Sequence, residues 1–532
     1  MAVNAIKTPF TNMSFTPDVP SSSLQPNEYN EGYNIETDVR SVKSVLGDEY
    51  ILSLIPGQPI FVTGGFRTAA DWWFIVATVQ GQWYGINDTG ITNLTPPTGY
   101  ISTGYTVDTP ITDSWNGEVL FINDSINPPM YLLPTVNDFY LYDEAPDNYV
   151  WNYNPDWSSL TAGFMRLYNS PNLGSLLIAG NLTANVISTG TTINLPNTVR
   201  WSQNFGLNSG PTTWAPTLTN VANELEVPVR GPVQDGFPLN GNFYVCSYWD
   251  TVVFSPINYQ SSTAPSFGIK LLNQGRGLLN ENCWANVDNT VFGLDARDIW
   301  SFDGGGFRPI GNQRVKDYFY ANLNPNYTNQ VFMDHNSAKY QIEIFYPDLD
   351  STGQCNKMLA YRYDLDVWQP PRDVTKATMS AEAPNWTGTM FDLASRDIVY
   401  TTYQQDFGAN AKLVQKDTGT SFLGNTAIST LFQRNNISFG QPYSASVQVH
   451  RVLPEVYGTG NITVTVGGSN SVAGNVTYKT PVEMPIVTDN PWVQINQNEA
   501  RVNTIKIQSN SAVNSWQMSA ANWQVTVVQD TR

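Results

Sequence analysis

The sequence predicts an all-β protein. Short runs rich in Val, Ile, Tyr and Trp alternate with Asn-Gly, Asp-Gly and Pro turn signals, which is typical of strands joined by tight turns. No long segment shows the 3.6-residue periodicity of an amphipathic helix. Aromatic residues make up 13% and charged residues only 14% of the 532 residues, a composition that indicates a folded rather than a disordered chain.

The segment 1–30 is predicted to be an extended N-terminal arm, because Pro, Ser and Asn are frequent and no periodicity is visible. From residue 31 to residue 429 one pattern recurs: a short apolar strand, a polar turn, and a strand ending in a bulky ring. The pattern occurs in "DWWFIVATVQGQWYGIND" (71–88), "NGEVLFINDSINPPMYL" (116–132), "NGNFYVCSYWDTVVFSP" (240–256), "NTVFGLDARDIWSFDGG" (289–305), "SAKYQIEIFYPD" (337–348) and "MLAYRYDLDVWQPP" (358–371).

Irregularly spaced hairpins of this kind predict an irregular β-propeller of about six blades with long inter-blade loops. One small sheet cannot bury both of its faces alone, whereas sheets packed in a ring can. A pair of β-sandwiches is the alternative. Residues 430–532 carry cleaner period-2 strands with glycine turns, as in "GNITVTVGG", and predict a separate C-terminal antiparallel β-sheet or sandwich.

The net charge is −18 and the isoelectric point about 4.4. Clustered Lys and Arg, which proteins need to hold nucleic acid by counterion release, are not visible. Tight binding to DNA or to an anionic membrane is therefore disfavoured, but a surface along which DNA slides without adhering is compatible with this charge.

Two further features bear on location. The N-terminal "MAVNAIKTPFTNMSF" has no apolar core, so no Sec-type export signal is expected, and the longest apolar run, "WWFIVATV" (72–79), is too short to span a bilayer. Cys246, Cys283 and Cys355 are odd in number and outside any CxxC pattern, which argues against a disulfide scaffold or zinc site and favours a reducing cytoplasm.

The search for an active site is mostly negative. The chain has two histidines, His335 and His450, and neither sits in a Ser-His-Asp or Cys-His pattern. No GxSxG, Walker, HExxH or Rossmann motif occurs. Paired carboxylates are abundant among 45 acidic residues, so counting cannot exclude glycosidase chemistry. We predict no catalytic, cofactor-binding or metal-binding residues.

The stretch "NTVFGLDARDIWSFDGGGFRPIG" (289–311) concentrates acids, arginines and glycines. Asp295 and Asp298 stand three residues apart across a predicted hairpin turn. Aspartates accept local backbone hydrogen bonds in turns, and glycines supply the backbone angles of tight corners. A calcium site would require more oxygen ligands at regular spacing than this stretch offers. Turn chemistry is the preferred interpretation.

The run "NDFYLYDEAPDNYVWNYNPDW" (137–157) mixes rings with acids and is a candidate for a functional surface. Rings act as anchors at protein interfaces, and rings beside acids can also form a sugar platform. A long inter-blade loop that packs its rings on a neighbouring blade is the structural alternative. The predicted partner-binding residues are Tyr140, Tyr142, Tyr149, Trp151, Tyr153 and Trp157.

The order of four blocks resembles the tail-hub or nozzle proteins of short-tailed bacteriophages, the family of tail tubular protein B and the packaged-DNA stabilisation protein. The blocks are "NTVRWSQNFGLNSGPTTWAP" (197–216), "GPVQDGFPLNGNFYVCSYWDTVVFSP" (231–256), residues 268–324 with the Gly-x-Gly and "DIWSFDG" elements, and "NEARVNTIKIQSNSAVNSWQMSAANWQVTVVQDTR" at the C-terminus. The resemblance extends over about two-thirds of the chain. The sequence departs from the family in its N-terminal arm and in the loop 137–157.

The resemblance implies a non-enzymatic virion protein that is made in the host cytoplasm and forms a ring, usually a hexamer, in the phage tail. Such hubs contact the tail adaptor below the portal, anchor fibres or spikes, close the channel on packaged DNA and pass the duplex during ejection. A ring of six acidic copies would have a negatively charged lumen that repels the phosphates of DNA. The alternative function is a carbohydrate-binding or glycan-cleaving β-propeller.

Overall fold

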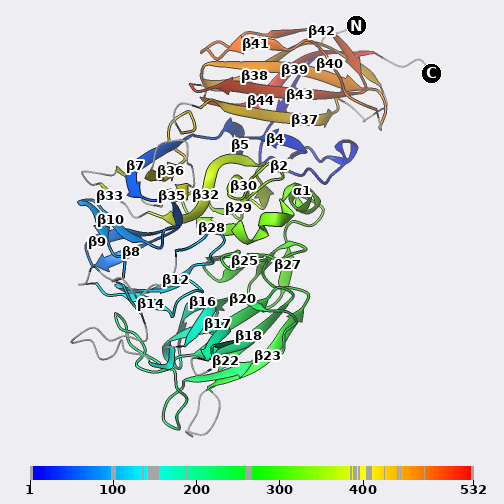
Figure 1. Ribbon diagram of the computed structural model, residues 1–532. Helices are drawn as coiled ribbons and strands as arrows, with labels where there is room; N and C mark the ends of the chain where they lie inside the picture. Colours follow the sequence, from blue (N-terminus) through cyan, green and yellow to red (C-terminus); the bar gives the residue numbers. More distant parts are fainter. Residues whose placement is uncertain are drawn as a thin grey trace.

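The computed structural model confirms the all-β class: 59% of residues are in strands and 4% in helices (Figure 1). The structure describes residues 4–96, 104–134, 137, 139–141, 155–157, 159–186, 189–257, 266–383, 386–387, 392–393, 396–402, 410–423, 426–439, 443, 445–472, 474–513 and 515–528.

Within these residues, five four-stranded antiparallel sheets follow one another along the chain. Each is a meander, in which every strand pairs with the next, and we call them strand groups 1 to 5. They are group 1, β8 (Pro59–Thr68), β9 (Asp71–Thr78), β10 (Trp83–Asn87) and β11 (Gly90–Asn93); group 2, β12 (Thr112–Asn116), β13 (Val119–Asn123), β14 (Met130–Leu132) and β15 (Tyr140–Leu141); group 3, β16 (Leu160–Ser170), β17 (Gly174–Val186), β18 (Thr191–Trp201) and β19 (Asn223–Glu226); group 4, β20 (Val233–Leu239), β21 (Asn242–Ser247), β22 (Asp250–Pro256) and β23 (Phe267–Gln274); and group 5, β24 (Trp284–Val287), β25 (Thr290–Leu294), β26 (Ile299–Phe302) and β27 (Phe307–Pro309).

An eight-stranded sheet continues the series, after helix α1 (Lys316–Asn322) and the 3-10 helix η4 (Pro325–Gln330). Its first part, strand group 6, contains β28 (Phe332–Asn336), β29 (Gln341–Tyr346), β30 (Cys355–Arg362) and β31 (Val367–Trp368). Its second part, strand group 7, contains β32 (Arg372–Glu382), β35 (Ile398–Thr402), β36 (Asn410–Lys416) and β7 (Asp48–Pro56). A separate two-stranded hairpin, β33 (Trp386–Thr387) with β34 (Asp392–Leu393), lies between β32 and β35 in the sequence.

Strand β7 comes from the start of this region and pairs antiparallel with β36 from its end, in the register Asn410 opposite Pro56 and Lys416 opposite Asp48. Backbone hydrogen bonds therefore join segments that are more than 350 residues apart in the sequence. The last strand group is completed by the first strand of the region.

The first strands of successive groups are neighbours. Contacts join β12 to β16, β16 to β20, β24 to β28, β28 to β32, and β32 back to β8. Side-chain hydrogen bonds join the two remaining steps: Thr63 on β8 to Asp113 on β12, and Trp284 on β24 to Asp235 on β20. No single sheet closes on itself within the described residues, and a propeller of six blades is not confirmed.

Two further sheets form a separate layer at the top of Figure 1, where both chain termini also lie. One has the order β42-β38-β44-β6-β5 with β1 on β44, and the other the order β4-β37-β43-β39-β40 with β41 on β39. We call them the sandwich, and their strands are β1 (Asn4–Pro9), β4 (Glu31–Tyr33), β5 (Ile35–Asp38), β6 (Ser41–Ser44), β37 (Ile428–Ile437), β38 (Ser446–Thr459), β39 (Asn461–Ser469), β40 (Thr477–Tyr478), β41 (Val482–Pro485), β42 (Val493–Ala500), β43 (Val502–Ser511) and β44 (Ser515–Val528).

The predicted N-terminal arm contributes to this layer. Residues 4–9 pair along β44, and Lys7 forms an ion pair with Glu455 on β38 at 2.7 Å. The arm also contains η1 (Ser21–Ser23) and the short parallel pair β2 (Ser14–Phe15) and β3 (Glu28–Tyr29).

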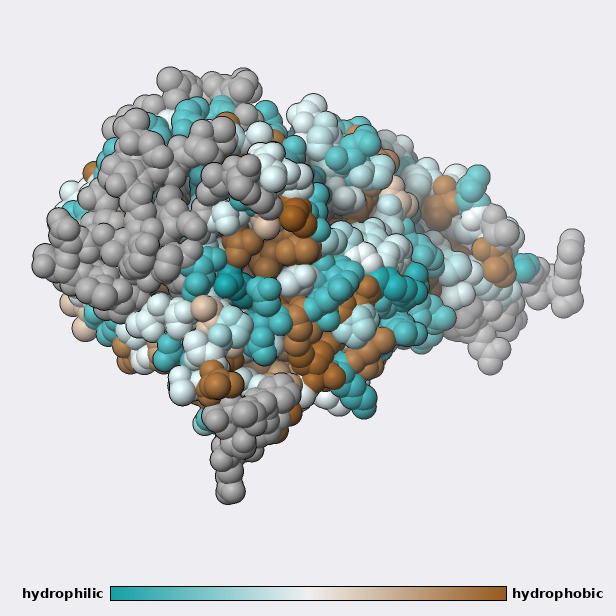
Figure 2. Space-filling model, turned by 60° about the horizontal axis from the view of Figure 1, so that its bottom comes forward, coloured by the Kyte–Doolittle hydropathy of each residue, from teal (hydrophilic) through white to brown (hydrophobic). Residues whose placement is uncertain are grey.

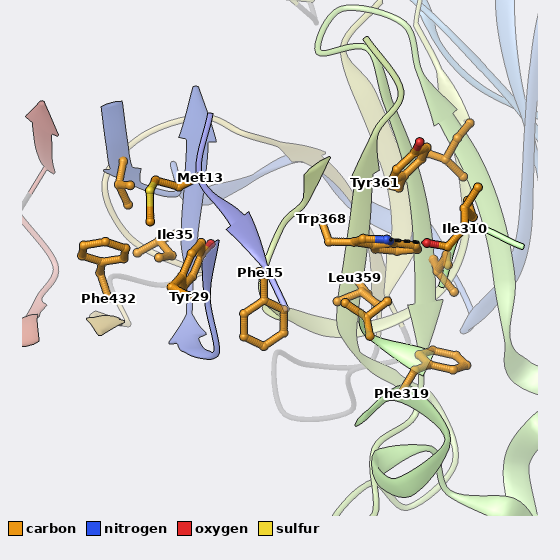
Figure 3. Close-up of a cluster of buried hydrophobic side chains, with 14 of the residues drawn as sticks. Met13, Phe15, Tyr29, Ile35, Ile310, Phe319, Leu359, Tyr361, Trp368 and Phe432 are labelled. Carbon is orange, nitrogen blue, oxygen red and sulfur yellow. Dashed lines mark hydrogen bonds between the residues drawn. The ribbon is translucent and has the colours of Figure 1, made fainter. Parts of the chain in front are cut away.

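One hydrophobic core continues from the sandwich into the strand groups (Figure 3). Phe432 on β37 packs against Tyr29 with ring centroids 5.2 Å apart, and Tyr29 packs against Phe15 at 5.7 Å. Phe15 in turn meets Tyr318 on α1 at 5.4 Å, while the indole of Trp368 donates to the carbonyl of Ile310 at 3.0 Å. Rings from the N-terminal segment thus fill the space between the two parts.

No helix among the described residues is long and apolar enough to cross a membrane.

Truncating Phe15 tests this connection. Phe15 is 2% exposed, so Phe15→Ala is expected to lower the free energy of unfolding by about 3 kcal/mol through lost burial and a residual cavity. Phe66→Ala is the matched control, because Phe66 is 45% exposed and its loss should cost about 1 kcal/mol or less. Guanidinium denaturation followed by tryptophan fluorescence measures both, and equal losses would contradict the assigned role of Phe15.

Candidate functional site

The guanidinium of Arg166, on β16, lies where the first strands of several groups meet. Its Nε and Nη2 donate to the two carboxylate oxygens of Asp235 on β20, at 3.0 and 2.6 Å. Nη2 also donates to Oδ1 of Asn282 at 2.7 Å, and Nη1 donates to the backbone carbonyl of Asp113 at 3.2 Å. The guanidinium carbon is 5.3 Å from the ring centroid of Trp284. One side chain therefore contacts groups 2, 4 and 5 from group 3.

Hydrogen bonds extend this arrangement in both directions. The hydroxyl of Thr63 donates to Asp113 at 2.5 Å and accepts from the indole of Trp115 at 3.0 Å. The indole of Trp284 donates to Asp235 at 2.8 Å. A continuous polar chain thus joins five consecutive groups, and we call it the axial chain, with members Thr63, Asp113, Trp115, Arg166, Asp235, Asn282 and Trp284.

The one cation of the axial chain, Arg166, is shared by its two acids, Asp113 and Asp235. The Asp235 side chain is 0% exposed and that of Arg166 only 10%. Burial raises the pKa of Asp113, and the charge of Arg166 acts in the opposite direction. Burial also disfavours the charged guanidinium, but Asp235 and Asp113 together hold the pKa of Arg166 above its ordinary value. Such a bidentate pair withstands burial because every charge has a partner.

A cavity of about 300 Å³ lies beside the axial chain. Residues 107–111, between groups 1 and 2, line it, together with residues of η4 and of the turn 279–282. The amide of Gln330 donates to the carbonyl of Val107 at 2.6 Å and to the carboxylate of Asp108 at 2.8 Å. The amide of Asn282 donates to the carbonyl of Ile111 at 3.0 Å. These bonds hold a loop of group 2 against elements that lead into groups 5 and 6.

Glu281 is an acid of this cavity. Burial, with the nearby charge of Asp235, raises its pKa to about 7. The folded protein therefore keeps this proton up to about pH 7, whereas the unfolded chain loses it near its ordinary value of 4.5. More protons are bound in the folded state across that interval, so the contribution of Glu281 to stability falls as the pH rises through it.

A second set of buried charges lies where β7 completes group 7. Arg372 on β32 forms ion pairs with Asp48 on β7 and with Asp417. Lys416 bridges Asp417 at 2.5 Å and Glu343 on β29 at 2.9 Å.

The same set reaches the sandwich, because Lys339 contacts Asp417 at 2.9 Å and Glu36 on β5 at 2.5 Å. Burial alone would raise the pKa of Asp417, but Lys339, Lys416 and Arg372 together hold it well below its ordinary value. We call these residues the closure cluster: Glu36, Asp48, Lys339, Glu343, Arg372, Lys416 and Asp417.

The aspartates at 295 and 298 occupy a hairpin turn, as the sequence predicts. Oδ1 of Asp295 accepts from the backbone N–H groups of Arg297 and Asp298, at 2.7 and 2.8 Å. Oδ1 of Asp298 accepts from the N–H of Ile299 at 2.9 Å. Arg276 forms ion pairs with both acids, at 3.2 and 3.4 Å. Turn chemistry is confirmed for this pair.

The predicted partner-binding residues divide into three cases. Tyr140 is in β15, opposite Tyr131 on β14. Trp157, in η3 (Pro155–Trp157), is fully buried, with its ring 5.0 Å from that of Trp214 and the guanidinium of Arg200 over it at 5.3 Å. Such packing is that of a core residue within this chain. The others lie outside the described residues: Tyr142, Tyr149, Trp151 and Tyr153.

The histidines and cysteines occupy structural positions. Nε2 of His335 is 3.0 Å from the hydroxyl of Tyr363, and Nε2 of His450 is 2.8 Å from that of Thr526. All three cysteines are free and buried. The described part of the chain contains no group of three or more His, Cys, Asp or Glu side chains that could hold a metal ion.

The sequence contained a signal for the axial chain. Arg166 interrupts the otherwise uncharged strand "LTAGFMRLY". A single cation within a strand that is otherwise buried requires a buried acid nearby. Its partners come from distant segments, so the pairing itself was not visible.

No protein-family model matches the chain, and no curated protein matches its sequence.

Replacing the central cation tests the axial chain. Arg166→Met leaves Asp235 buried without its cation, so the free energy of unfolding is expected to fall by about 3–5 kcal/mol. Lys7→Met is the control, because the Lys7 side chain is 56% exposed and its ion pair should contribute about 1 kcal/mol or less. Urea denaturation followed by fluorescence gives both values. A loss in Arg166→Met no larger than in Lys7→Met would contradict the role of the axial chain.

The titration of Glu281 gives a second prediction. Glu281→Gln is expected to leave the melting temperature close to that of the parent protein at pH 5, where the parent carboxyl is protonated when folded. At pH 8 the variant is expected to melt at a higher temperature, because it avoids a buried charge. Differential scanning calorimetry at the two pH values measures the difference, and an equal effect at both would contradict the raised pKa.

Proposed function

We propose that this chain is a structural subunit of the tail hub or nozzle of a short-tailed bacteriophage. The observation that carries the proposal is the order of the four sequence blocks at 197–216, 231–256, 268–324 and the C-terminus. In this proposal the subunit is not an enzyme. It forms a hexameric ring in the virion, contacts the adaptor below the portal, and holds fibres or spikes.

The use of the buried charges supports a structural role. Among the described residues, Arg166 and Asp235 join groups 3 and 4, and Lys416 and Glu343 join groups 7 and 6. Asp295 and Asp298 stabilise a turn. In the charge clusters described above, ionic side chains are committed to holding the scaffold together, as expected of a part that bears load.

We also propose that residues 48–416 form a β-propeller, with seven strand groups as its blades rather than the six expected from the sequence. The proposal is supported by the succession of neighbouring first strands and by the contact of β32 with β8. It is supported further by β7, which supplies the last strand of group 7 from the beginning of the region. The pairing of β7 with β36 would close the ring of strand groups within one subunit.

The axial chain has a consequence for DNA passage. If the groups surround an axis, Arg166 and the loop 104–111 occupy the middle of each subunit. The duplex would then pass between the six copies, not through any one of them. A lumen lined by subunits of charge −18 would repel phosphate and keep the DNA from adhering.

Exposed apolar side chains support assembly with other copies or tail proteins. Leu207 is 74% exposed and Leu218 72%, both in the segment between β18 and β19, and Ile193 on β18 is 47% exposed. The face shown in Figure 2 carries several separate hydrophobic patches within hydrophilic surface. Apolar contacts with a polar surround are typical of protein interfaces.

The copy number in virions tests the proposal. Quantitative mass spectrometry of purified phage particles is expected to find about six copies of the chain per portal ring, since closed rings fix the number of subunits. Signal from the portal protein in the same sample calibrates the count. Absence of the chain from particles would overturn the proposal.

A further inference from the structure

A pocket of about 250 Å³ lies between strand groups 5 and 6, and most of its wall comes from the stretch 290–310. Ring side chains line it from β25 and from β30 and the residues after it: Phe292, Tyr361 and Tyr363. Polar side chains line it from β26, β27 and the turn between them: Ser301, Asp303 and Arg308. None of these residues belongs to the axial chain or the closure cluster.

The rings form a fixed wall. Phe292 and Tyr361 are buried, at 6% and 4% exposure, with centroids 6.0 Å apart. Tyr363 is half-buried and lies 6.1 Å from Phe292, at an angle of 33°. Its hydroxyl is 3.0 Å from Nε2 of His335, and the ring of Tyr340 meets it edge-on at 6.0 Å. Contacts on several sides therefore hold the ring of Tyr363 in place.

Asp303 presents a carboxylate at the pocket. Its Oδ1 accepts from the N–H groups of Gly305 and Gly306 at 2.8 and 3.3 Å, and these bonds lower the pKa of the carboxyl. Within the described part of the chain, no protein donor contacts its Oδ2. A Cβ atom at Gly306 would meet nothing within 4 Å, so this side of the pocket is open.

Arg308 supplies the donors. Its side chain is 71% exposed, and Asp366, 3.7 Å away, is its ion-pair partner. A guanidinium has five N–H groups in a planar fork, so most of them remain available to a ligand after one weak ion pair. Ser301 adds a hydroxyl that can donate or accept.

We propose that this pocket binds a single neutral hexopyranose unit of a glycan. The C–H face of a pyranose can lie against an aromatic ring such as that of Tyr363, and two adjacent hydroxyls can donate to a carboxylate such as that of Asp303. The guanidinium of Arg308 would donate to the ring oxygen or a hydroxyl. A few polar groups that fix orientation beside an apolar wall are typical of small-molecule sites.

Size and charge favour this ligand over others. The volume is below the range of roughly 300–1,000 Å³ typical of sites for drug-sized ligands, so one small ring fits better than a larger molecule. The polar wall combines one acid with one base and has no net charge. It therefore favours a neutral polyhydroxylated ligand over an anion or a cation. The inference does not depend on the proposed role in a phage tail.

Saturation-transfer NMR with the full-length protein tests the proposal, using the methyl pyranosides of glucose, galactose and mannose as separate probes. Methyl glucuronide, a charged sugar, and glycine, a zwitterion of similar polarity, serve as comparison ligands. At least one neutral pyranoside is expected to bind weakly, in the millimolar range, because a single ring offers few contacts. Binding of only the glucuronide or only glycine would overturn the proposal, as would binding of no pyranoside.

Three variants locate the binding. Tyr363→Ala removes the ring wall, Asp303→Asn removes the charge while keeping the acceptor that the turn needs, and Arg308→Met removes the donors. Each is expected to weaken pyranoside binding about tenfold or more. Arg40→Met, in the exposed turn between β5 and β6, and Tyr457→Ala, at a side chain 66% exposed on the sandwich, are the matched controls and should bind as the parent does.

Circular dichroism and melting temperature establish that each variant is folded. Arg308 and Asp303 are exposed, so their variants keep the test open even if Tyr363→Ala unfolds. Pyranoside binding that survives in folded Asp303→Asn and Arg308→Met would place the sugar elsewhere and overturn the assignment to this pocket.

Discussion

The bidentate pair between Arg166 and Asp235 is the interaction on which the arrangement of strand groups depends. Neighbouring sheets that meet through apolar faces alone can slide, because apolar contacts are not directional. A guanidinium whose donors face a carboxylate, a carbonyl and an amide permits one geometry. Five groups share this chain of hydrogen bonds, so the relative position of each is tied to the others through a single buried cation.

The closure cluster applies the same principle to the parts of the chain that are distant in sequence. Asp417 forms ion pairs with Lys339, Lys416 and Arg372. Arg372 also pairs with Asp48 on β7, and Lys339 also pairs with Glu36 in the sandwich. A chain with only 14% charged residues thus places several of its charges inside. Removing one partner leaves the others uncompensated and is strongly destabilising, although the intact cluster adds little net stability because burying its charges is costly.

Local features of the fold were predictable, and long-range features were not. Turns at Gln80-Gly81 and between Asp295 and Asp298 were visible because their chemistry resides in adjacent residues. The pairing of β7 with β36 depends on contacts across most of the chain, which no local pattern encodes. Trp157 shows why the candidate interaction surface was harder to predict. A ring next to acids in the sequence indicates an interface anchor, but Trp214, 57 residues away, packs against Trp157 in the fold and buries it.

The closing strand β7 also constrains synthesis of the protein. Strand β7 is synthesised long before its partner β36, which ends at Lys416. Strands β1, β4 and β6 pair with β37 or β44, the first of which begins at Ile428. Until then β1, β4 and β7 lack the strands with which they pair in the native structure. Non-local pairing of this kind slows folding and exposes unpaired strands to other chains. The sandwich therefore reaches its native pairing only after β44 (Ser515–Val528) has been synthesised.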